Sequence, residues 1–344
     1  MNEQAAPPSV ADENFSFQKI IAVVGISLLA VKFAAWAMTR SVSILTDATE
    51  SIVNVVAAFV GLYALYLSSK PRDKSHPYGH GKVELISSSL EGVMILVAGI
   101  VIIFEAVDSI MDPGELKQLD LGLILLVFAA AVNFIVGYAA IRKGRKNRSI
   151  ALVASGKHLC SDTVSSIGII IGVGLMIILD VMGYEVYWID SAIAALFGFI
   201  ISVAGVRVVK TSMDGVMDRS DEKVVTEVIE LINQKRHDHW IDIHNLRVIK
   251  YGPLLHIEMH MIFPRRMTVE QQRIEMLEAQ DAVRERYGDN LDITIMGEPC
   301  DDSLCRVCGI DCDRRAVEFE GRIDWTFETV TDGDEHHGSA DVDQ

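Results

Sequence analysis

Residues 42–67 read VSILTDATESIVNVVAAFVGLYALYL, an apolar stretch that carries a few polar side chains. Five further apolar stretches lie at 20–38, 85–110, 119–141, 150–182 and 186–209. A helix needs about 20 residues to cross a hydrocarbon core of ~30 Å, and backbone groups left unpaired in lipid exclude irregular structure there. The sequence therefore predicts a bundle of six transmembrane helices over residues 16–210, with the lipid bilayer as a partner.

Basic residues are unevenly shared between the connections of these stretches. The connections after the second and fourth stretches are rich in lysine and arginine (Lys70, Arg72, Lys74 and Lys82, then Arg142, Lys143, Arg145, Lys146 and Arg148), whereas Arg40 and Lys117 stand on the other side. Basic loops stay in the cytosol. The pattern predicts a multi-pass protein of the inner (cytoplasmic) membrane with both termini cytosolic. The polar, acidic segment 1–15 does not resemble a cleavable signal peptide.

A second, polar part follows the last apolar stretch. Residues 221–235 and 268–287 show helical patterns, and residues 244–251, 254–263 and 291–296 read as strands. The order helix-strand-strand-helix-strand predicts a cytosolic α+β domain, ferredoxin-like in outline, over residues 211–299. A Cys-rich extension over 300–330 is expected to include a hairpin at 316–330, and the acidic tail 331–344 is expected to be disordered.

The overall charge limits the partners. The 344 residues carry a formal net charge of −16. Nucleic acid is bound through broad basic surfaces, so it is not an expected partner.

Two apolar stretches each carry a pair of metal-ligand groups at a spacing of four residues. Glu50 and Asn54 form one pair in the second stretch, and His158 and Asp162 form the other in the fifth. Residues four apart share one face of a helix, so each pair points in one direction. Asp47 lies on the same side as Glu50 and is a further candidate, although its position nearer the outer surface favours a structural role.

The expected depth of the two pairs is the same. Glu50 follows Arg40 by ten residues and His158 follows Arg148 by ten, which corresponds to about 15 Å from opposite ends of a helix. Both pairs therefore reach the middle of the bilayer, where ionisable groups are costly and usually mark an ion path. The alternative is a set of interhelical hydrogen bonds with a protonated Glu50.

The cytosolic parts contain two further groups of ligand-type residues. Asp73, His76 and His80 lie in one loop, where they predict either a second metal site or a solvated turn. His256 and His260 alternate with apolar residues and so share a face of a strand. With His244 they predict a regulatory metal site, and simple solvent exposure of that face is the alternative.

Four of the five cysteines lie within thirteen residues, at positions 300, 305, 308 and 312. Thiolates at this spacing can surround one tetrahedral zinc ion, which predicts a structural zinc site made by Cys300, Cys305, Cys308 and Cys312. An iron–sulfur cluster and plain unligated cysteines remain alternatives, and the spacing matches no common ferredoxin pattern. Cys160 lies two residues, about 200° around the helix, from both His158 and Asp162 and is interpreted as a packing residue.

These motifs resemble those of the cation diffusion facilitator family. The resemblance rests on His158-x-x-x-Asp162, on the serine-containing entry Ser41-Val42-Ser43-Ile44-Leu45 and on the loop His76-Pro77-Tyr78-Gly79-His80-Gly81-Lys82, and it covers about residues 15–300. It implies a homodimeric metal/proton antiporter, not an enzyme, with a tetrahedral site on the second and fifth helices. It also implies that Lys82 interlocks with an acid near the end of the last helix, for which Asp218 is the best match and Asp214 the alternative.

The resemblance implies a divalent cation as the substrate. Zinc is the first expectation, with iron, manganese and cobalt as alternatives. The alternatives stay open because the family usually carries Asp or His where Asn54 stands, and an amide oxygen is a poor zinc ligand. Protons compete with metal for the same groups, so proton-coupled alternating access is the expected mechanism. A non-transporting membrane metal sensor or scaffold and a membrane metalloenzyme are the rival functions.

Overall fold

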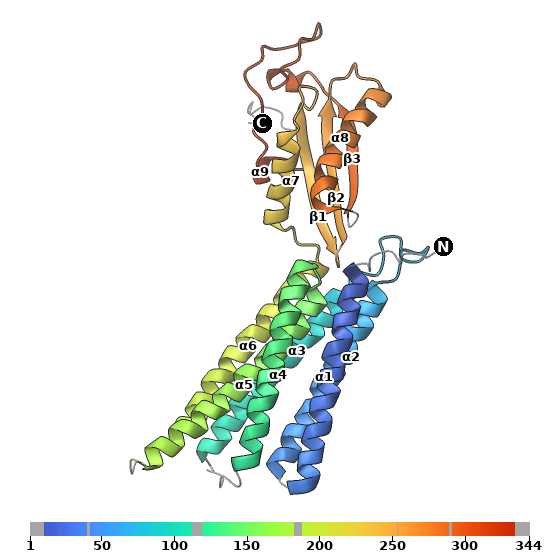
Figure 1. The fold of residues 1–344 in the computed structure, drawn as a ribbon. Coiled ribbons are helices and arrows are strands. Elements are labelled where there is room, and N and C mark those ends of the chain that lie inside the picture. Colours follow the sequence, from blue (N-terminus) through green and yellow to red (C-terminus); the bar gives the residue numbers. More distant parts are fainter. Residues whose placement is uncertain are drawn as a thin grey trace, which may run out of the picture. The chain divides into compact units, whose positions relative to one another are not determined.

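The computed structural model describes residues 10–333 apart from 40–41, 112–118, 182–187, 253 and 289–290. The chain divides into two compact units, Met1–Met217 and Asp218–Gln344. The first is helical and the second combines helices with a small sheet (Figure 1). This is the predicted fold class.

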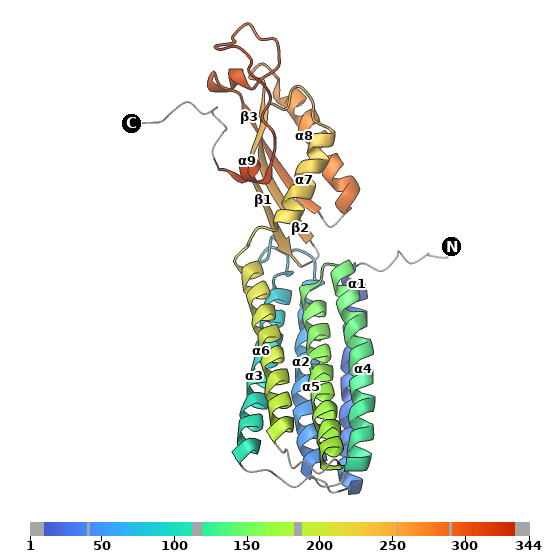
Figure 2. The same ribbon diagram turned by 90° about the vertical axis from the view of Figure 1, so that its left-hand side faces the viewer.

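Six long helices make up the described part of the first unit: α1 (Val10–Thr39), α2 (Val42–Ser68), α3 (Val83–Met111), α4 (Leu119–Lys146), α5 (Ile150–Val181) and α6 (Trp188–Val216). Three pairs pack most extensively: α3 with α6 and α4 with α5 (Figure 2), and α1 with α2 (Figure 1). Helix α5 also contacts α2, α3 and α6. Helix α5 therefore packs against these three helices as well as against α4.

Glycines allow the closest helix pair to approach. A Cβ on Gly99 of α3 would come within 2.5 Å of the Ser202 Oγ atom of α6, and a Cβ on Gly205 would come within 2.5 Å of the Leu96 backbone nitrogen. Small residues commonly let membrane helices approach in this way.

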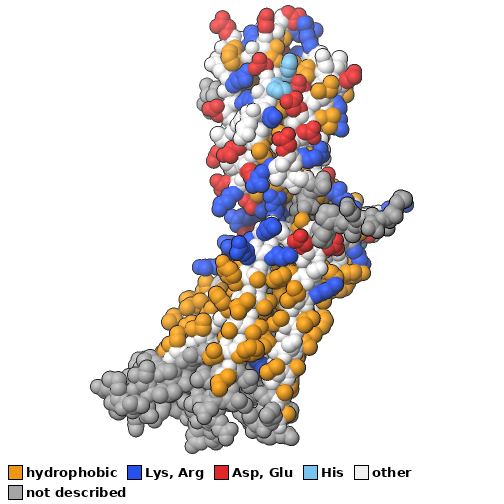
Figure 3. All heavy atoms as spheres, viewed as in Figure 1, with side chains coloured by type: hydrophobic (Ala, Val, Ile, Leu, Met, Phe, Trp, Pro, Cys, Tyr) orange, Lys and Arg blue, Asp and Glu red, His pale blue; other side chains and the backbone are white. Residues whose placement is uncertain are grey.

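The outer surface of this unit is apolar. Figure 3 shows hydrophobic side chains over the flanks of the helices and Lys and Arg side chains gathered at one end. Among the residues described, four helices contain a segment long and apolar enough to span a membrane: Val10–Ala34, Val83–Asp108, Val127–Lys146 and Ser191–Val216. Large exposed residues such as Phe104, Ile135 and Phe199 lie in them. An apolar surface of this kind is suited to lipid.

Both ends of the predicted membrane region differ from the structure. Helix α1 begins at Val10, so the predicted polar segment 1–15 is partly helical. Asp12 and Glu13 favour the positive N-terminal end of the helix. Asn14 is buried and its Oδ1 accepts a 2.6 Å bond from Asn147. At the other end, α6 continues to Val216 rather than ending near 210.

The second unit is built around a three-stranded sheet. Its elements are α7 (Glu222–Gln234), β1 (Asp242–Tyr251), β2 (Leu254–Phe263), α8 (Val269–Tyr287) and β3 (Leu291–Pro299). Strand β2 is central, antiparallel to β1 and parallel to β3. The parallel pair is joined through α8, as a crossover connection requires.

The two faces of β2 have different environments. Leu255, Ile257, Met259, Met261 and Phe263 are fully buried and share a core with α7 and α8. The intervening His256, Glu258 and His260 point to the opposite face and are only partly buried. The alternation predicted from the sequence is therefore observed. It places the polar face of the strand away from both helices.

The predicted hairpin at 316–330 is wrong. Residues 316–326 have no strand, and the segment ends in a short helix, α9 (Phe327–Thr331). Its Thr326 cap and the stacking of Arg236 on the Trp325 ring at 3.6 Å hold it to the domain core. The backbone N–H of Asn245 donates to the Asp332 carbonyl at 2.7 Å, so the beginning of the predicted disordered tail is ordered. Residues 334–344 lie outside the described part.

Candidate transport metal centre

Asn54 of α2 joins the two predicted ligands of α5. Its Nδ2 group donates to Asp162 Oδ2 at 2.7 Å, and its Oδ1 atom lies 3.0 Å from His158 Nε2. His158 is 6% exposed, and no hydrogen-bond partner of its Nδ1 atom occurs among the described residues. The structure therefore brings Asn54, His158 and Asp162 together between two helices that neighbour each other (Figure 2).

The contacts of Asn54 occupy the atoms that a cation would need. An amide oxygen only accepts, so Nε2 of His158 carries the hydrogen in this arrangement. A cation bound here would replace that hydrogen and the Asn54–Asp162 bond by direct coordination. The hydrogen on Nε2 would pass to Nδ1, and that tautomer of the imidazole would leave Nε2 free to coordinate.

The remaining predicted ligands of this centre lie beyond what the structure describes in atomic detail. Asp47 and Glu50 are within α2, but their side chains fall outside the described residues. Their backbone positions, seven and four residues before Asn54, are those that the helical pattern predicts.

One basic residue near this centre was missed in the sequence. Lys32 Nζ of α1 donates to Ser51 Oγ of α2 at 2.7 Å, three residues before Asn54. A lysine inside an apolar helix is itself a signal of function or of a buried polar contact. This signal was present in the first apolar stretch.

The loop between α2 and α3 brings its three predicted ligands together. Asp73 Oδ1 lies 3.2 Å from His76 Nδ1, and Asp73 Oδ2 lies 3.6 Å from His80 Nε2. Hydrogen bonds from Ser75 and from the His76 backbone hold the pKa of Asp73 well below its usual range. Asp73 therefore supplies a carboxylate that stays ionised at neutral pH. The left-handed φ of 87° at Gly79 allows the chain to turn between the two histidines.

In the second unit, a different carboxylate completes the predicted histidine pair. His244 and His260 are direct neighbours across β1 and β2, with ring centroids 5.0 Å apart. Glu298 of β3 lies 3.4 Å from His244 Nε2 and 2.9 Å from His260 Nδ1. A β-bulge follows His244, where Asn245 has a φ of 53°. Bulges commonly re-aim side chains in this way.

His256 does not join this group. It lies four residues from His260 along β2, and its Nδ1 atom contacts Asp292 at 3.2 Å instead. The shared strand face was correctly predicted, but two residues of a strand four positions apart are separated by about 13 Å. Glu298 was missed because the sequence does not show which residue of β3 pairs beside Ile262.

The four clustered cysteines are close in sequence but not assembled as a site. Among the described residues, the groups of three or more ligand atoms within 4.8 Å of one another contain no cysteine. Cys308 is buried, and burial raises the pKa of its thiol. Arg315 nevertheless organises the segment by donating to the carbonyls of Cys305 and Cys308 at 2.8 and 2.9 Å, and the Ala316 N–H points to Cys305 Sγ at 3.4 Å.

The predicted interlock residues lie at helix boundaries. Lys82 immediately precedes α3, and Asp218 follows α6 with a left-handed φ of 57°. They belong to different units, so their pairing stays a prediction.

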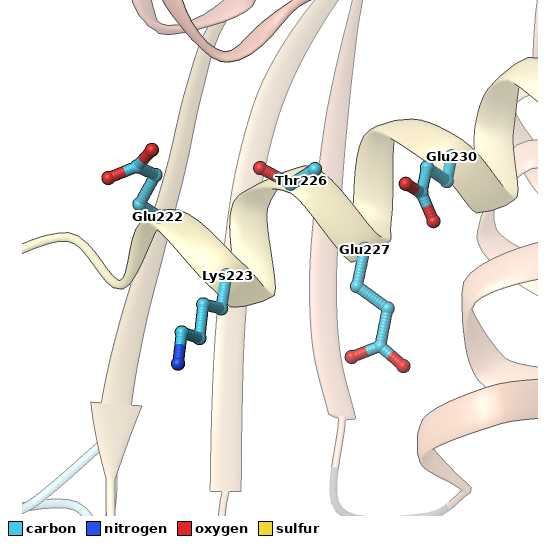
Figure 4. A pocket seen from close by; sticks show the side chains of 5 residues that line it. All are labelled: Glu222, Lys223, Thr226, Glu227 and Glu230. Atoms are coloured by element: carbon cyan, nitrogen blue, oxygen red, sulfur yellow. The ribbon is translucent and has the colours of Figure 1, made fainter.

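Two further polar groups lie in the second unit. Both ring nitrogens of His237 face carboxylates, Glu275 at 2.9 Å and Glu278 at 3.3 Å, and these three side chains form a further group that could hold a metal ion. An open hollow runs along α7 and is lined by Glu222, Lys223, Thr226, Glu227 and Glu230 (Figure 4). Glu227 is already bonded to Arg286 and Tyr287, both at 2.6 Å. The lining residues are not among the described groups that could hold a metal ion.

Comparison with known proteins matches both units to one family. The model of the cation efflux transmembrane domain matches residues 19–217, and that of the cation efflux protein cytoplasmic domain, a dimerisation domain, matches residues 220–300. An uncharacterized transporter of Synechocystis is 34% identical over 278 residues, which are 80% of this chain and 87% of the relative.

Two more distant relatives have descriptive names. The manganese efflux system protein MneP of Bacillus subtilis is 25% identical over 81% of this chain and 94% of its own. The cation-efflux pump FieF of Citrobacter koseri is 24% identical over 79% of this chain and 88% of its own. These relatives are transporters rather than enzymes. With its helical membrane domain, its small α+β domain and these matches, the chain belongs to the cation diffusion facilitator family of cation efflux transporters.

Proposed function

We propose that this protein exports a divalent transition-metal cation from the cytosol across the inner membrane in exchange for protons. The observation that carries the proposal is the contact of Asn54 with both His158 and Asp162 in the interior of the helical unit. Buried polar groups in a bundle that faces lipid are retained at a cost and usually line an ion path. Family membership supports cation efflux as the activity.

The donor set bears on the identity of the cation. One imidazole nitrogen, one carboxylate and one amide oxygen form a centre that Glu50 is proposed to complete. Oxygen-rich sets suit manganese and iron, whereas zinc prefers nitrogen and sulfur donors. Zinc stays the first prediction from the motif resemblance, and manganese is the alternative favoured by Asn54 and by the name of one relative.

Alternating access would give metal transport through this centre its direction. A loaded centre with Glu50 and Asp162 ionised balances one divalent cation, and exposure to an acidic outer side would return protons to the ligands and release the metal. Rocking of the bundle between inward- and outward-open states would connect the two steps. The loop at Asp73 and the cytosolic centre at His244, His260 and Glu298 are proposed as further metal sites, the latter acting to tighten a homodimer.

The cysteine segment is proposed to hold a structural zinc ion. Arg315 already fixes the backbone around Cys305 and Cys308, and one backbone N–H points to a sulfur.

The direct test is uptake into sealed vesicles. We expect the reconstituted wild-type protein to accumulate zinc or manganese under a pH gradient, and the folded Asp162→Ala variant to show background uptake. The matched control is Cys160→Ala, because Cys160 lies on the same helix and packs toward Gly137 of α4. Metal binding without uptake by the wild type would favour a sensor or scaffold instead.

A further inference from the structure

A buried glutamate that is not among the predicted metal ligands lies in the same helical interior. Glu91 of α3 is 1% exposed. Its Oε1 atom accepts from Ser155 Oγ of α5 at 2.8 Å, and that hydroxyl accepts from Gln18 Nε2 of α1 at 3.1 Å. Gly61 of α2 makes room for the group, since a Cβ there would come within 2.6 Å of Gln18 Nε2 and 3.0 Å of Glu91 Oε1.

Glu91 is one of three polar sites that face α2 at positions spaced seven residues apart. On α2, Asn54, Gly61 and Ser68 are seven residues apart and face the metal centre, Glu91 and Glu84 respectively. Seven residues of helix are about 10 Å long. Ser68 ends α2 at the side with the basic connections, which is predicted to be cytosolic. Glu91 therefore lies about 10 Å from the metal centre, toward the end of the bundle that is predicted to be cytosolic.

Glu91 and Glu84 are satisfied to different degrees. Both oxygens of Glu84 are bonded, by Ser68 at 2.9 Å and by Ser149 at 2.6 Å. In Glu91, the Oε2 atom is buried and has no hydrogen-bond partner in the described part, and the same holds for Gln18 Oε1. Both oxygen atoms are hydrogen-bond acceptors without a donor in the described part. A proton on Glu91 Oε2 would turn that oxygen into a donor.

Among the described residues, no positively charged side chain forms a hydrogen bond or ion pair with Glu91. The titratable side chains on the packed helices include Lys19 on α1, Lys157 and His158 on α5, Arg207 on α6 and Glu84 on α3 itself. Lys19 lies over the Phe15 ring at 4.3 Å. A single carboxylate with neutral neighbours matches the charge of a proton and not that of a divalent cation.

We propose that Glu91 is a proton-binding site of the transport cycle, separate from the metal ligands and placed between the metal centre and the cytosolic end of the bundle. A proton adds to the Glu91 carboxylate to give the neutral acid and later leaves to cytosolic water, with no other bond changed. The proposal rests on the proposed metal/proton exchange, because only there does such a proton count toward transport.

The test compares full-length wild-type protein with Glu91→Gln, which keeps the shape and cannot titrate. In vesicles we expect Glu91→Gln to retain metal binding, to lower the number of protons exchanged per metal by about one, and to flatten the pH dependence of uptake. Glu84→Gln is the matched control, since it removes a carboxyl from the same helix face, and its proton count should equal that of the wild type.

Infrared difference spectra between two pH values add a readout that does not need transport. The band of a protonated carboxyl should be present in the wild type and lost in Glu91→Gln. If Glu91→Gln does not fold, Glu91→Asp should shift the pH midpoint of uptake. An unchanged band, or a proton count and pH midpoint equal to the wild type, would overturn the proposal. A wild type that accumulates no metal would instead overturn the proposed function, while the band still decides whether Glu91 titrates.

Discussion

The helical unit and the sheet unit both bring histidine next to a carboxylate, but in different surroundings. In the first, His158 and Asp162 are joined through an amide on a neighbouring helix, and His158 Nδ1 has no hydrogen-bond partner among the described residues. In the second, His244 and His260 are in direct cross-strand register and share Glu298. Strand pairing holds the second group in register, whereas the first group depends only on side-chain contacts between two helices.

We propose that this difference separates a metal site for passage from a metal site for retention. A cation in transit must leave, so its ligands lie on elements that move relative to one another. A regulatory cation stabilises the state that binds it, and ligands on hydrogen-bonded strands suit that task. The comparison makes distinct predictions for each group.

The largest effect is expected from removing one histidine in each unit. We expect His158→Ala to reduce metal uptake in vesicles to background, because the centre loses its only described nitrogen ligand. We expect metal to raise the melting temperature of the wild-type protein, and His260→Ala should lose that increase while it keeps measurable uptake. The comparison fails if His260→Ala abolishes uptake or if His158→Ala transports normally.

The next effect concerns selectivity and sharpens the role of the amide. Asn54→Asp replaces an amide, a poor zinc ligand, by the carboxylate that the resemblance leads us to expect at this position, and it should shift competition between zinc and manganese toward zinc. Uptake of one labelled metal against increasing amounts of the other measures the shift. Unchanged selectivity would mean that Asn54 positions the ligands without contacting the cation. The corresponding control in the second unit is Asn245→Asp beside His260, which should leave transport selectivity unchanged.

The extent of successful prediction also differs between the units. The helices and the approach of Asn54 to His158 and Asp162 followed from length, hydropathy and i, i+4 spacing, because the bilayer fixes both helix length and depth. Glu298 could not be placed, since pairing between distant strands depends on a bulge and a crossover that leave no local mark. The hairpin at 316–330 failed because a weak alternation was outweighed by packing of Trp325 on the core.

A smaller effect is expected at the cysteine segment. Cys308 is buried and its thiol pKa is raised, so this thiol has to lose a proton when four thiolates bind zinc. The bound ion would in turn stabilise the folded domain. Cys305→Ser should remove zinc from the purified domain and lower its melting temperature to that of the wild type treated with a chelator. Cys160→Ser in the full-length protein is the control and should not change zinc content. A wild-type domain free of zinc and iron would show these cysteines to be unligated.

The smallest effect is expected at Asp221, which tests how much one capping residue contributes to the stability of the sheet unit without metal. Asp221 caps α7 through the N–H groups of Lys223 and Val224 and pairs with Lys250 of β1. Partial burial acts to raise the pKa of Asp221, but the bond and charge of Lys250 and the two helix N–H groups outweigh it and lower the pKa.

Because the folded-state pKa is lowered, the stabilisation is present above the unfolded pKa and is lost as the pH falls through the folded value. At neutral pH, Asp221→Ala should lower the free energy of unfolding by about 1 kcal/mol through the lost cap. Asp221→Asn keeps the capping oxygen and should cost only about 0.5 kcal/mol, as expected for an exposed ion pair. Urea unfolding of the second unit at neutral and acidic pH measures both. The wild type and Asp221→Asn should converge in acid, and a constant difference between them would show that the charge of Asp221 contributes nothing.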